Sequence, residues 1–152
     1  MTRNVSTPEI SGPWGRPQVD EFLGSAIIPI RLATTGRSGP LVQSMWFLWD
    51  DGLLRCATQA DAVIVQRLAA DPRCGFKVAA DSPPYRGVRG RGTVRIDTEL
   101  GPAVLRRLIA RYLDSAQSPL ARWLLARAES EVALAIEPQR LSTWDYSARM
   151  QA

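Results

Sequence analysis

The segment over residues 41–92 constrains the fold more than any other part of the chain, because short strand-like runs and tight turns alternate along it. The runs that read as strands cover residues 41–49, 53–58, 74–80 and, from Val88 onward, 88–97. Asp51-Gly52, between the first two runs, is a dipeptide typical of β-hairpin turns. A short helix over residues 61–70 is expected to end at Asp71-Pro72, because the residue before a proline avoids the α conformation. The order predicts a sheet of mainly antiparallel strands.

The flanking segments complete this pattern. A helix is expected near residues 17–23, with Val19, Phe22 and Leu23 on its apolar face, and a strand over residues 25–35. The later elements are a helix over 100–113, a helix that starts at Ser118-Pro119, and strands over 132–137 and 141–146. The helix that starts at Ser118-Pro119 is expected to bury Leu120, Trp123, Leu124 and Ala128. Together these elements predict an α+β fold, a small antiparallel barrel of six to seven strands with peripheral helices.

The strand over residues 88–97 holds two glycines, Gly90 and Gly92, within a regular alternation of side chains. A dinucleotide-binding glycine loop must follow a strand and open a helix, and here the alternation continues through the glycines to Val94 and Ile96. The glycines are therefore expected to be structural, at a bend or a close backbone approach.

At 152 residues the chain is long enough for one domain, expected over residues 17–150 behind a flexible arm of residues 1–16. It contains no histidine, which excludes catalysis by a Ser-His-Asp triad and metal sites with histidine ligands. Cys56 and Cys74 lie in predicted strands and are expected to be reduced core thiols; a redox pair or metal site is the alternative. Without a signal peptide or a long apolar run, a cytoplasmic protein with no membrane partner is expected.

The net charge of +4 comes from 19 basic residues, of which Lys77 is the only lysine. They are spread along the chain without an aromatic–basic motif or a helix suited to a DNA groove, so no nucleic-acid partner is expected. A pocket for a small anionic or planar ligand is the better interpretation of the surplus charge.

Several short motifs are spread along the chain: Leu32-Ala33-Thr34-Thr35, Trp46-Phe47-Leu48 before Asp51-Gly52, Thr58 before Asp71-Pro72-Arg73, Pro84-Tyr85-Arg86-Gly87-Val88, Arg111-Tyr112-Leu113 and Trp144-Asp145-Tyr146-Ser147. Together they resemble the pyridoxamine 5′-phosphate oxidase-like family of FMN-binding split β-barrels, in particular its flavin- and deazaflavin-dependent oxidoreductases. The resemblance implies a homodimer with FMN or a deazaflavin coenzyme in the groove between the subunits. The sequence gives no support for oxidation of pyridoxamine phosphate itself, because the histidine and arginine pattern that binds this substrate is not recognisable.

The resemblance also implies where a cofactor would bind. The candidate cofactor-binding residues are Ser44, Met45, Trp46, Arg55, Thr58, Gln59, Arg67, Arg86 and Trp144. Ser44 and Met45 would meet the ring edge through their backbone, and Trp46 and Trp144 would cover the ring. Thr58 and Gln59 would supply hydrogen bonds, and the three arginines would supply charge for the phosphate. The pattern assigns no catalytic residue and no metal ligand.

One part of the sequence departs from the family. The family places a lysine and a neighbouring polar residue at the start of the helix over 61–70, where this chain has Ile64 and Ala62. Asp61 is expected to occupy the helix N-terminus as its N-cap, and its charge would repel a phosphate. The alternatives are a flavin- or deazaflavin-dependent oxidoreductase with unknown substrate, and a non-enzymatic ligand-binding or regulatory barrel that has lost the phosphate clamp.

The run Trp46-Phe47-Leu48-Trp49 is apolar on both faces, which favours a homodimer whose partner covers one face.

Overall fold

The computed structural model describes residues 5–150. Its strands are β1 (Glu9–Ser11), β2 (Ile30–Thr34), β3 (Leu41–Met45), β4 (Leu48–Asp50), β5 (Leu53–Gln59), β6 (Arg73–Ala79), β7 (Arg86–Asp97) and β8 (Glu131–Asp145). Its helices are α1 (Arg16–Ser25), α2 (Val63–Ala70), α3 (Gly101–Tyr112) and α4 (Pro119–Ala126), with a 3-10 turn, η1, over Ala128–Ser130. The predicted α+β class is confirmed. Among residues 5–150, no helix is long and apolar enough to cross a membrane.

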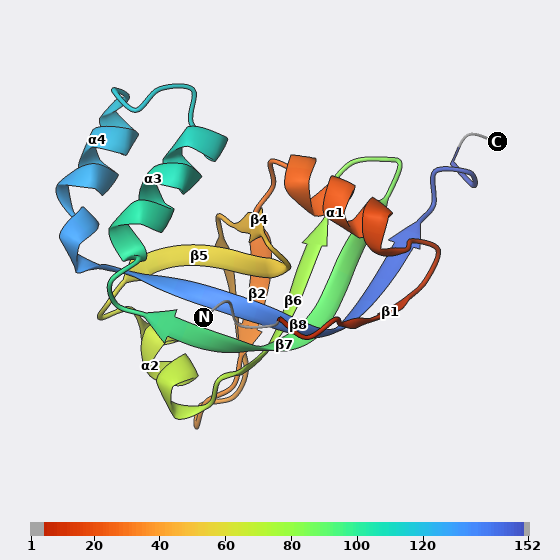
Figure 1. Ribbon diagram of the computed structural model, residues 1–152, viewed down its shortest axis with the longest axis horizontal. Coiled ribbons are helices and arrows are strands. Elements are labelled where there is room, and N and C mark those ends of the chain that lie inside the picture. The colour runs from red at the N-terminus through yellow and green to blue at the C-terminus, as the bar shows by residue number, and fades with distance from the viewer. Residues whose placement is uncertain (1–4, 151–152) are drawn as a thin grey trace.

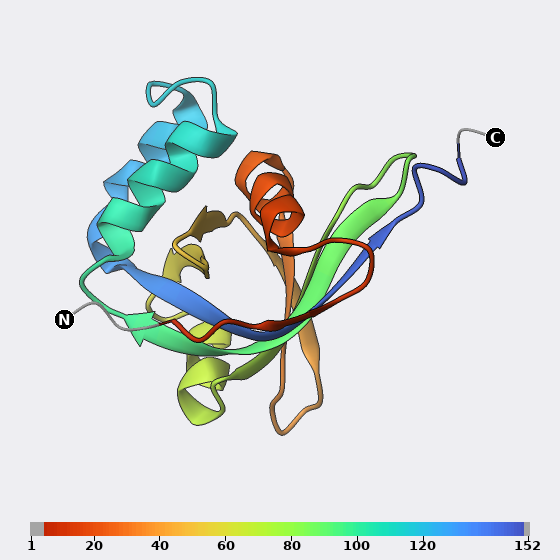
Figure 2. The ribbon, with the colours of Figure 1, turned by 45° about the vertical axis from the view of Figure 1, so that its right-hand side comes forward.

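The sheet curls because one segment of the chain borders it at both ends. The strand order is β3-β2-β6-β7-β8-β5-β4, and β1 pairs with β8 off this path. β3 and β4 are consecutive in the sequence, and only Trp46 and Phe47 lie between them. The predicted strand over residues 41–49 is therefore bent into two pieces that pair with strands on opposite sides of the opening. Figures 1 and 2 show the resulting curved sheet, with α1 and α2 at opposite ends of the barrel.

The core of the barrel consists of side chains from the sheet and from the helices at its two ends. Buried side chains on the inner face of the sheet, such as Leu54, Val88 and Ile136, form one cluster with Phe22 and Leu23 of α1 and with Ile64 and Leu68 of α2. The expected apolar face of α1 is confirmed. The two helices close the ends of the barrel, so the inside is a packed core.

The last strand differs from the prediction. The strands expected over 132–137 and 141–146 are one continuous strand, β8, which pairs with both β5 and β7. Arg91 pairs with Arg140 and Gly92 with Pro138, so one additional residue, Gln139, is accommodated opposite this pair of positions. A bulge of this kind bends a strand and increases its twist, which explains how a proline is tolerated inside it.

The glycines of β7 have the structural role that the sequence predicts. Residues 87–92 lie in the first half of β7 rather than in a loop that opens a helix. A Cβ atom on Gly90 would overlap the carbonyl oxygen of Arg140 and approach Cζ of Phe76 to 2.7 Å. The barrel is so tightly curved here that only glycine leaves room for the core and the neighbouring strand.

The strand expected over residues 25–35 begins later, at Ile30. α1 continues to Ser25, and Arg111 of α3 donates hydrogen bonds to the carbonyl oxygens of Leu23, Gly24 and Ala26 at distances of 3.1, 2.9 and 2.6 Å. These bonds satisfy carbonyls that a helix end leaves without partners. The chain between α1 and β2 is therefore a connector held by α3, a long-range contact that local sequence does not reveal.

Two predicted signals are confirmed in detail. Asp51 and Gly52 both have positive φ angles, of 52° and 78°, as the tight hairpin turn between β4 and β5 requires. Ser118 caps α4, because its hydroxyl accepts a hydrogen bond from the backbone N–H of Ala121 at 3.2 Å.

The buried face of α4 was partly mispredicted. Leu120 is 46% exposed and Trp123 is 55% exposed, whereas Ala121 is fully buried. The helix is only eight residues long and contacts α3 through Ala121 and Leu124. Two large apolar side chains consequently remain at the surface.

From residue 5 onward the segment predicted as a flexible arm has defined structure; residues 1–4 lie outside the described residues. β1 pairs in parallel with the second half of β8. Trp14 donates a hydrogen bond from Nε1 to Asp145 at 3.2 Å, and its ring packs against Phe22 with centroids 5.1 Å apart. The arm therefore lies along the edge of the second half of β8.

The apolar run at residues 46–49 is covered within the chain. Phe47 and Leu48 are buried, and Trp46 stacks on Tyr112 of α3 with ring centroids 5.1 Å apart. On the other side, Trp49 donates a hydrogen bond to Asp20 of α1 at 2.8 Å. α1 and α3 therefore cover much of this run, so the run alone does not require a partner subunit, and the homodimer stays a prediction.

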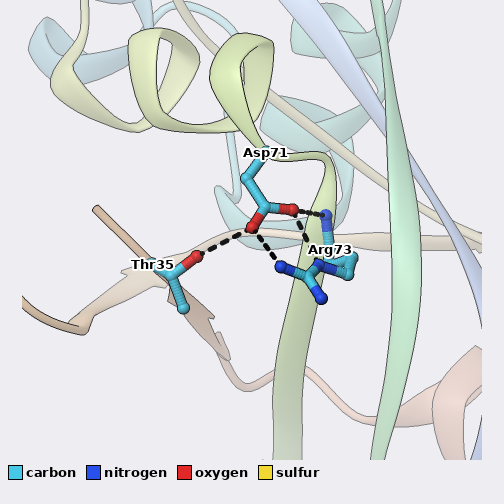
Figure 3. Close-up of polar contacts among 3 residues, drawn as sticks. All are labelled: Thr35, Asp71 and Arg73. Carbon is cyan, nitrogen blue, oxygen red and sulfur yellow. Dashed lines mark hydrogen bonds and ion pairs between the residues drawn. The ribbon is translucent and has the colours of Figure 1, made fainter. Parts of the chain in front are cut away.

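The junction between α2 and β6 is held by a carboxylate (Figure 3). Asp71 accepts two hydrogen bonds from the Arg73 side chain, at 3.0 and 2.8 Å, and one from the hydroxyl of Thr35 at 3.2 Å. The hydrogen bonds from the side chain and backbone of Arg73 hold the pKa of Asp71 well below its usual value. The contact joins the end of β2 to the start of β6.

Candidate functional site

A cavity of about 400 Å³, called the apolar pocket below, opens between the sheet and the α3–α4 pair. Ser44, Met45 and Trp46 come from β3 and the bend after it, and Thr58 comes from β5. Leucines of α3 and α4 form the opposite wall, and Glu131 at the start of β8 completes the lining. The structure thus brings together four of the nine predicted cofactor-binding residues, although they are separated by up to fourteen positions in the sequence.

The bend after β3 gives the pocket a rigid aromatic edge. Trp46 and the Tyr112 ring are nearly parallel, with 6° between their planes. The Tyr112 hydroxyl donates a hydrogen bond to the Ile28 carbonyl at 2.7 Å and accepts one from the Phe47 N–H at 3.3 Å. Burial raises the pKa of Tyr112. Tyr112 was not among the predicted site residues; its place in the Arg111-Tyr112-Leu113 motif was the available signal.

The pocket also contains a buried carboxylate that the sequence did not reveal. Glu131 is 5% exposed and accepts a hydrogen bond on Oε1 from Gln59 Nε2 at 2.6 Å. Gln59 in turn accepts a hydrogen bond from the Ser130 hydroxyl at 2.7 Å. Within residues 5–150, Oε2 of Glu131 has no hydrogen-bond partner. Gln59, a predicted cofactor ligand, therefore holds Glu131 in place.

Two of the predicted phosphate-binding arginines hold loops. Arg55 donates to Asp50 at 3.1 Å, and Arg107 of α3 donates to the same carboxyl oxygen at 2.9 Å. The hydrogen bond from Arg107 is the largest cause of the lowered pKa of Asp50. Arg67 donates to the Gly39 carbonyl at 2.8 Å and to the Ser38 hydroxyl at 3.0 Å, which fixes the β2–β3 turn. Neither arginine lines the apolar pocket.

Arg86 and Trp144 lie on a different part of the surface. The guanidinium carbon of Arg86 is 5.9 Å from the centre of the Phe22 ring, near α1. Trp144 lies on β8, where Nζ of Lys77 and Cζ of Arg89 are 5.7 and 5.9 Å from its ring centre. Within one subunit these two candidates are not part of the apolar pocket.

The expected arrangement at the start of α2 needs correction. The N-cap of α2 is Ala62 rather than Asp61, and no side chain caps the helix. Asp61 is exposed outside the helix, so the argument that it occupies the N-terminal anion position was wrong. Ile64 is fully buried in the barrel core. Counting from Asp71-Pro72 located the helix correctly, but it did not reveal which side of the helix faces the core.

Comparisons with known proteins place this geometry in a class. No protein-family model matches the sequence, and none of the curated proteins matches it. Among solved structures, the conserved hypothetical protein Rv2991 from Mycobacterium tuberculosis is 24% identical, with a TM-score of 0.73 over 93% of this chain and 91% of that chain. An F420 reductase is 26% identical, with a TM-score of 0.70 over 86% of this chain and 98% of that chain. A candidate pyridoxamine 5′-phosphate oxidase from Listeria innocua is 16% identical, with a TM-score of 0.64 over 84% of this chain and 95% of that chain.

The protein therefore has the fold of the pyridoxamine 5′-phosphate oxidase-like split barrels, and the resemblance stated from its sequence motifs is confirmed at that level. Its sheet is a curled, mainly antiparallel barrel with four helices. Proteins of this fold include flavin- and F420-dependent oxidoreductases and also proteins with other roles. The fold alone therefore does not identify which of these activities this protein has.

Proposed function

We propose that the protein is a flavin- or deazaflavin-dependent oxidoreductase whose cofactor ring binds in the apolar pocket. The observation that carries the proposal is the convergence of Ser44, Met45, Trp46 and Thr58 on one cavity of about 400 Å³. The similarity to an F420 reductase over 98% of that protein's length supports it. We further propose that the working form is a homodimer in which a second subunit covers the pocket entrance.

The residues of the pocket fit the ring of such a cofactor. Its walls are mainly apolar, and leucines of α3 and α4 would exclude water from the ring. Thr58 and Ser44 supply hydroxyl groups for a ring edge or a hydroxylated chain. When bound, the cofactor supplies the hydride chemistry, which requires no histidine from the protein.

The residues of the pocket do not fit the cofactor's phosphate. No arginine or lysine is among the described residues that line it, and Glu131 contributes a carboxylate. Arg31 of β2 lies directly opposite Ser44 in the β2–β3 register, so it is the cation placed beside this edge of the pocket. The anionic end of the cofactor would therefore have to leave the pocket past Ser44.

Glu131 favours a second candidate function, a ligand-binding split barrel without enzymatic activity. An unpaired buried carboxylate oxygen is costly, by about 1–3 kcal/mol, and a ligand with an N–H donor or a positive charge would remove that cost. Such a ligand would be a planar or apolar amine rather than a phosphate ester. The same carboxylate would disfavour a flavin phosphate in the pocket.

Titration of the purified protein with FMN and, separately, with a deazaflavin coenzyme, followed by fluorescence quenching, tests the first function. Saturable binding of one of them is expected. Thr58→Val, which removes one hydroxyl at almost constant volume, should weaken it about twofold to tenfold. Thr98→Val, outside the pocket between β7 and α3, is the matched control and should bind like the wild type.

The second function makes the opposite prediction for the same preparation. Flavins would then cause no saturable quenching, whereas an aromatic amine such as 2-phenylethylamine would raise the melting temperature. Glu131→Gln would abolish that protection because it removes the negative charge. If neither flavins nor the amine bind to folded protein, both assignments of the apolar pocket fail.

A further inference from the structure

The outer face of the sheet carries a row of cations that lies outside the apolar pocket. Residues that pair directly across five neighbouring strands form the row Ser44–Arg31–Lys77–Arg89–Ser142. The three central members are positively charged and lie on β2, β6 and β7. Two residues further along β7 and β8, on the same face of the sheet, Arg91 pairs directly with Arg140.

These residues border a hollow of about 730 Å³, called the basic groove below. All five cations line it, together with Ser142, and no acidic residue is among its described lining residues. Gly75, which pairs directly with Arg91, has no side chain, which leaves the floor of the groove open there. The groove lies on the outside of the sheet, separate from the buried barrel core.

Charge compensation in the groove is incomplete. Within residues 5–150, Arg140 forms an ion pair with Glu9 at 2.9 Å, but Arg31, Lys77 and Arg89 form none. Lys77 and Arg89 both lie over the Trp144 ring, which attracts them weakly, whereas Arg31 forms no such contact with an aromatic ring of residues 5–150. Like charges directly opposite each other on neighbouring strands destabilise a sheet. A row of three therefore opposes folding unless something of opposite charge binds to it.

The spacing of the row indicates the kind of ligand. Neighbouring strands lie about 4.8 Å apart, so cations on three neighbouring strands span about 10 Å. A single phosphate is too small to contact all three, whereas two or three linked anionic groups match that span. Arginine binds phosphate and carboxylate oxygens in a bidentate manner, and the Ser142 hydroxyl at the end of the row adds a donor.

We propose that the basic groove is a binding site for a small molecule with two or more linked anionic groups, held by Arg31, Lys77 and Arg89. None of these three cations lines the apolar pocket, although Arg31 lies beside its edge at Ser44. Tripolyphosphate binding without flavin binding would support this proposal alone, and flavin binding without tripolyphosphate binding would support the flavin proposal alone.

Isothermal titration with sodium tripolyphosphate tests the proposal, with inorganic phosphate as the single-anion comparison. Tripolyphosphate is expected to bind at one site per chain, and inorganic phosphate at least about tenfold more weakly. Arg31→Gln and Arg89→Gln should each weaken tripolyphosphate binding by about tenfold or more, since each removes charge-assisted hydrogen bonds. Arg95→Gln is the matched control, because Arg95 lies on β7 but does not line the groove.

A second measurement separates a binding role from a merely structural one. In the absence of ligand, Arg31→Gln should raise the melting temperature by about 1 to 3 °C, because it removes the repulsion between Arg31 and Lys77. The same variant would thus gain stability and lose affinity. The proposal is overturned if Arg95→Gln weakens binding as much as Arg31→Gln does, if the melting temperature of Arg31→Gln falls, or if tripolyphosphate does not bind. Tighter binding of a single-stranded oligonucleotide than of tripolyphosphate would also overturn it.

Discussion

Burial controls the chemistry of the two cysteine residues. Cys56 is fully buried on β5, and burial raises the pKa of its thiol to about 12. Burial likewise raises the pKa of the Cys74 thiol to about 11. A thiol reacts as its thiolate, so neither side chain is reactive near neutral pH. Both are free cysteines in the core, as expected from the sequence.

This burial leads to a prediction about thiol reactivity. In the folded protein at pH 8, neither cysteine should react with a disulfide reagent such as dithiobis-nitrobenzoate within minutes. In guanidinium chloride both thiols should react at once, which gives the count of two per chain and serves as the internal control. Rapid reaction of one thiol in the folded protein would restore the redox interpretation of this pair.

Gly90 allows a prediction about stability. Because a Cβ atom there would overlap the Arg140 carbonyl oxygen, Gly90→Ala should destabilise the protein by about 1–3 kcal/mol, the usual cost of overpacking. Gly24→Ala is the matched control: nothing lies within 4 Å of a Cβ at that position in α1, and alanine favours helix over glycine. Chemical denaturation measures both. Equal stability of Gly90→Ala and wild type would show that the strands can move apart at low cost.

At the scale of elements, the helices are held by contacts between distant parts of the chain. Arg111 caps the end of α1 from α3, and Asp71 joins the end of β2 to the α2–β6 junction (Figure 3). Each contact orders a connection that has little secondary structure of its own. The barrel therefore depends on a small number of polar contacts at its ends as well as on its core.

The Asp71 contact predicts a dependence of stability on pH. The pKa of Asp71 is lower in the folded protein than its usual 3.8, mainly because Arg73 donates hydrogen bonds to it. The contact therefore stabilises the protein above about pH 4 and loses its effect as the pH falls through the folded-state pKa. Asp71→Asn should lower the melting temperature by about 1 to 3 °C at pH 7.

The difference between Asp71→Asn and wild type should shrink as the pH is lowered below 3.8, where Asp71 of the unfolded chain begins to take up a proton while the folded chain keeps it ionised. Asp114→Asn, in the exposed connection between α3 and α4, is the control and should follow the wild type at every pH. A difference that is constant between pH 7 and pH 2.5 would mean that the charge of Asp71 is not responsible.

At the scale of the whole molecule, the apolar surface left around the pocket entrance is the main argument for association. About half of the surface of the Leu120 and Trp123 side chains of α4 is exposed, and Leu120 lines the apolar pocket. Exposed aromatic residues beside a pocket are typical of interaction sites. A partner that covered this face would also complete the pocket.

We therefore expect light scattering to give twice the chain mass of 16.8 kDa at micromolar concentration. Trp123→Glu should shift the protein toward the single-chain mass, because tryptophan side chains at the centre of an interface often contribute 2 kcal/mol or more, roughly thirtyfold in affinity. Arg122→Glu, on the neighbouring exposed position of α4, is the control and should remain a dimer. A single-chain mass for the wild type would contradict the homodimer proposal.

The sequence by itself determined the local elements and much of their order. Alternation of side chains identified β7 and the structural role of Gly90, helical spacing identified α3, and turn chemistry identified the Asp51-Gly52 hairpin. These signals work because each reflects the conformational preference of a few neighbouring residues. The motif around Trp46 and Thr58 also located four residues of one pocket.

Only the tertiary structure revealed the features that depend on contacts between residues distant in the sequence. The bend at Trp46-Phe47 closes the barrel, Ile64 faces the core rather than a ligand, and Glu131 reaches the apolar pocket from the start of β8. The row of Arg31, Lys77 and Arg89 exists because β2, which is distant in the sequence, pairs in register with the consecutive strands β6 and β7. Periodicity tells which side chains of one strand share a face, but the partners across a sheet follow from packing of the whole chain.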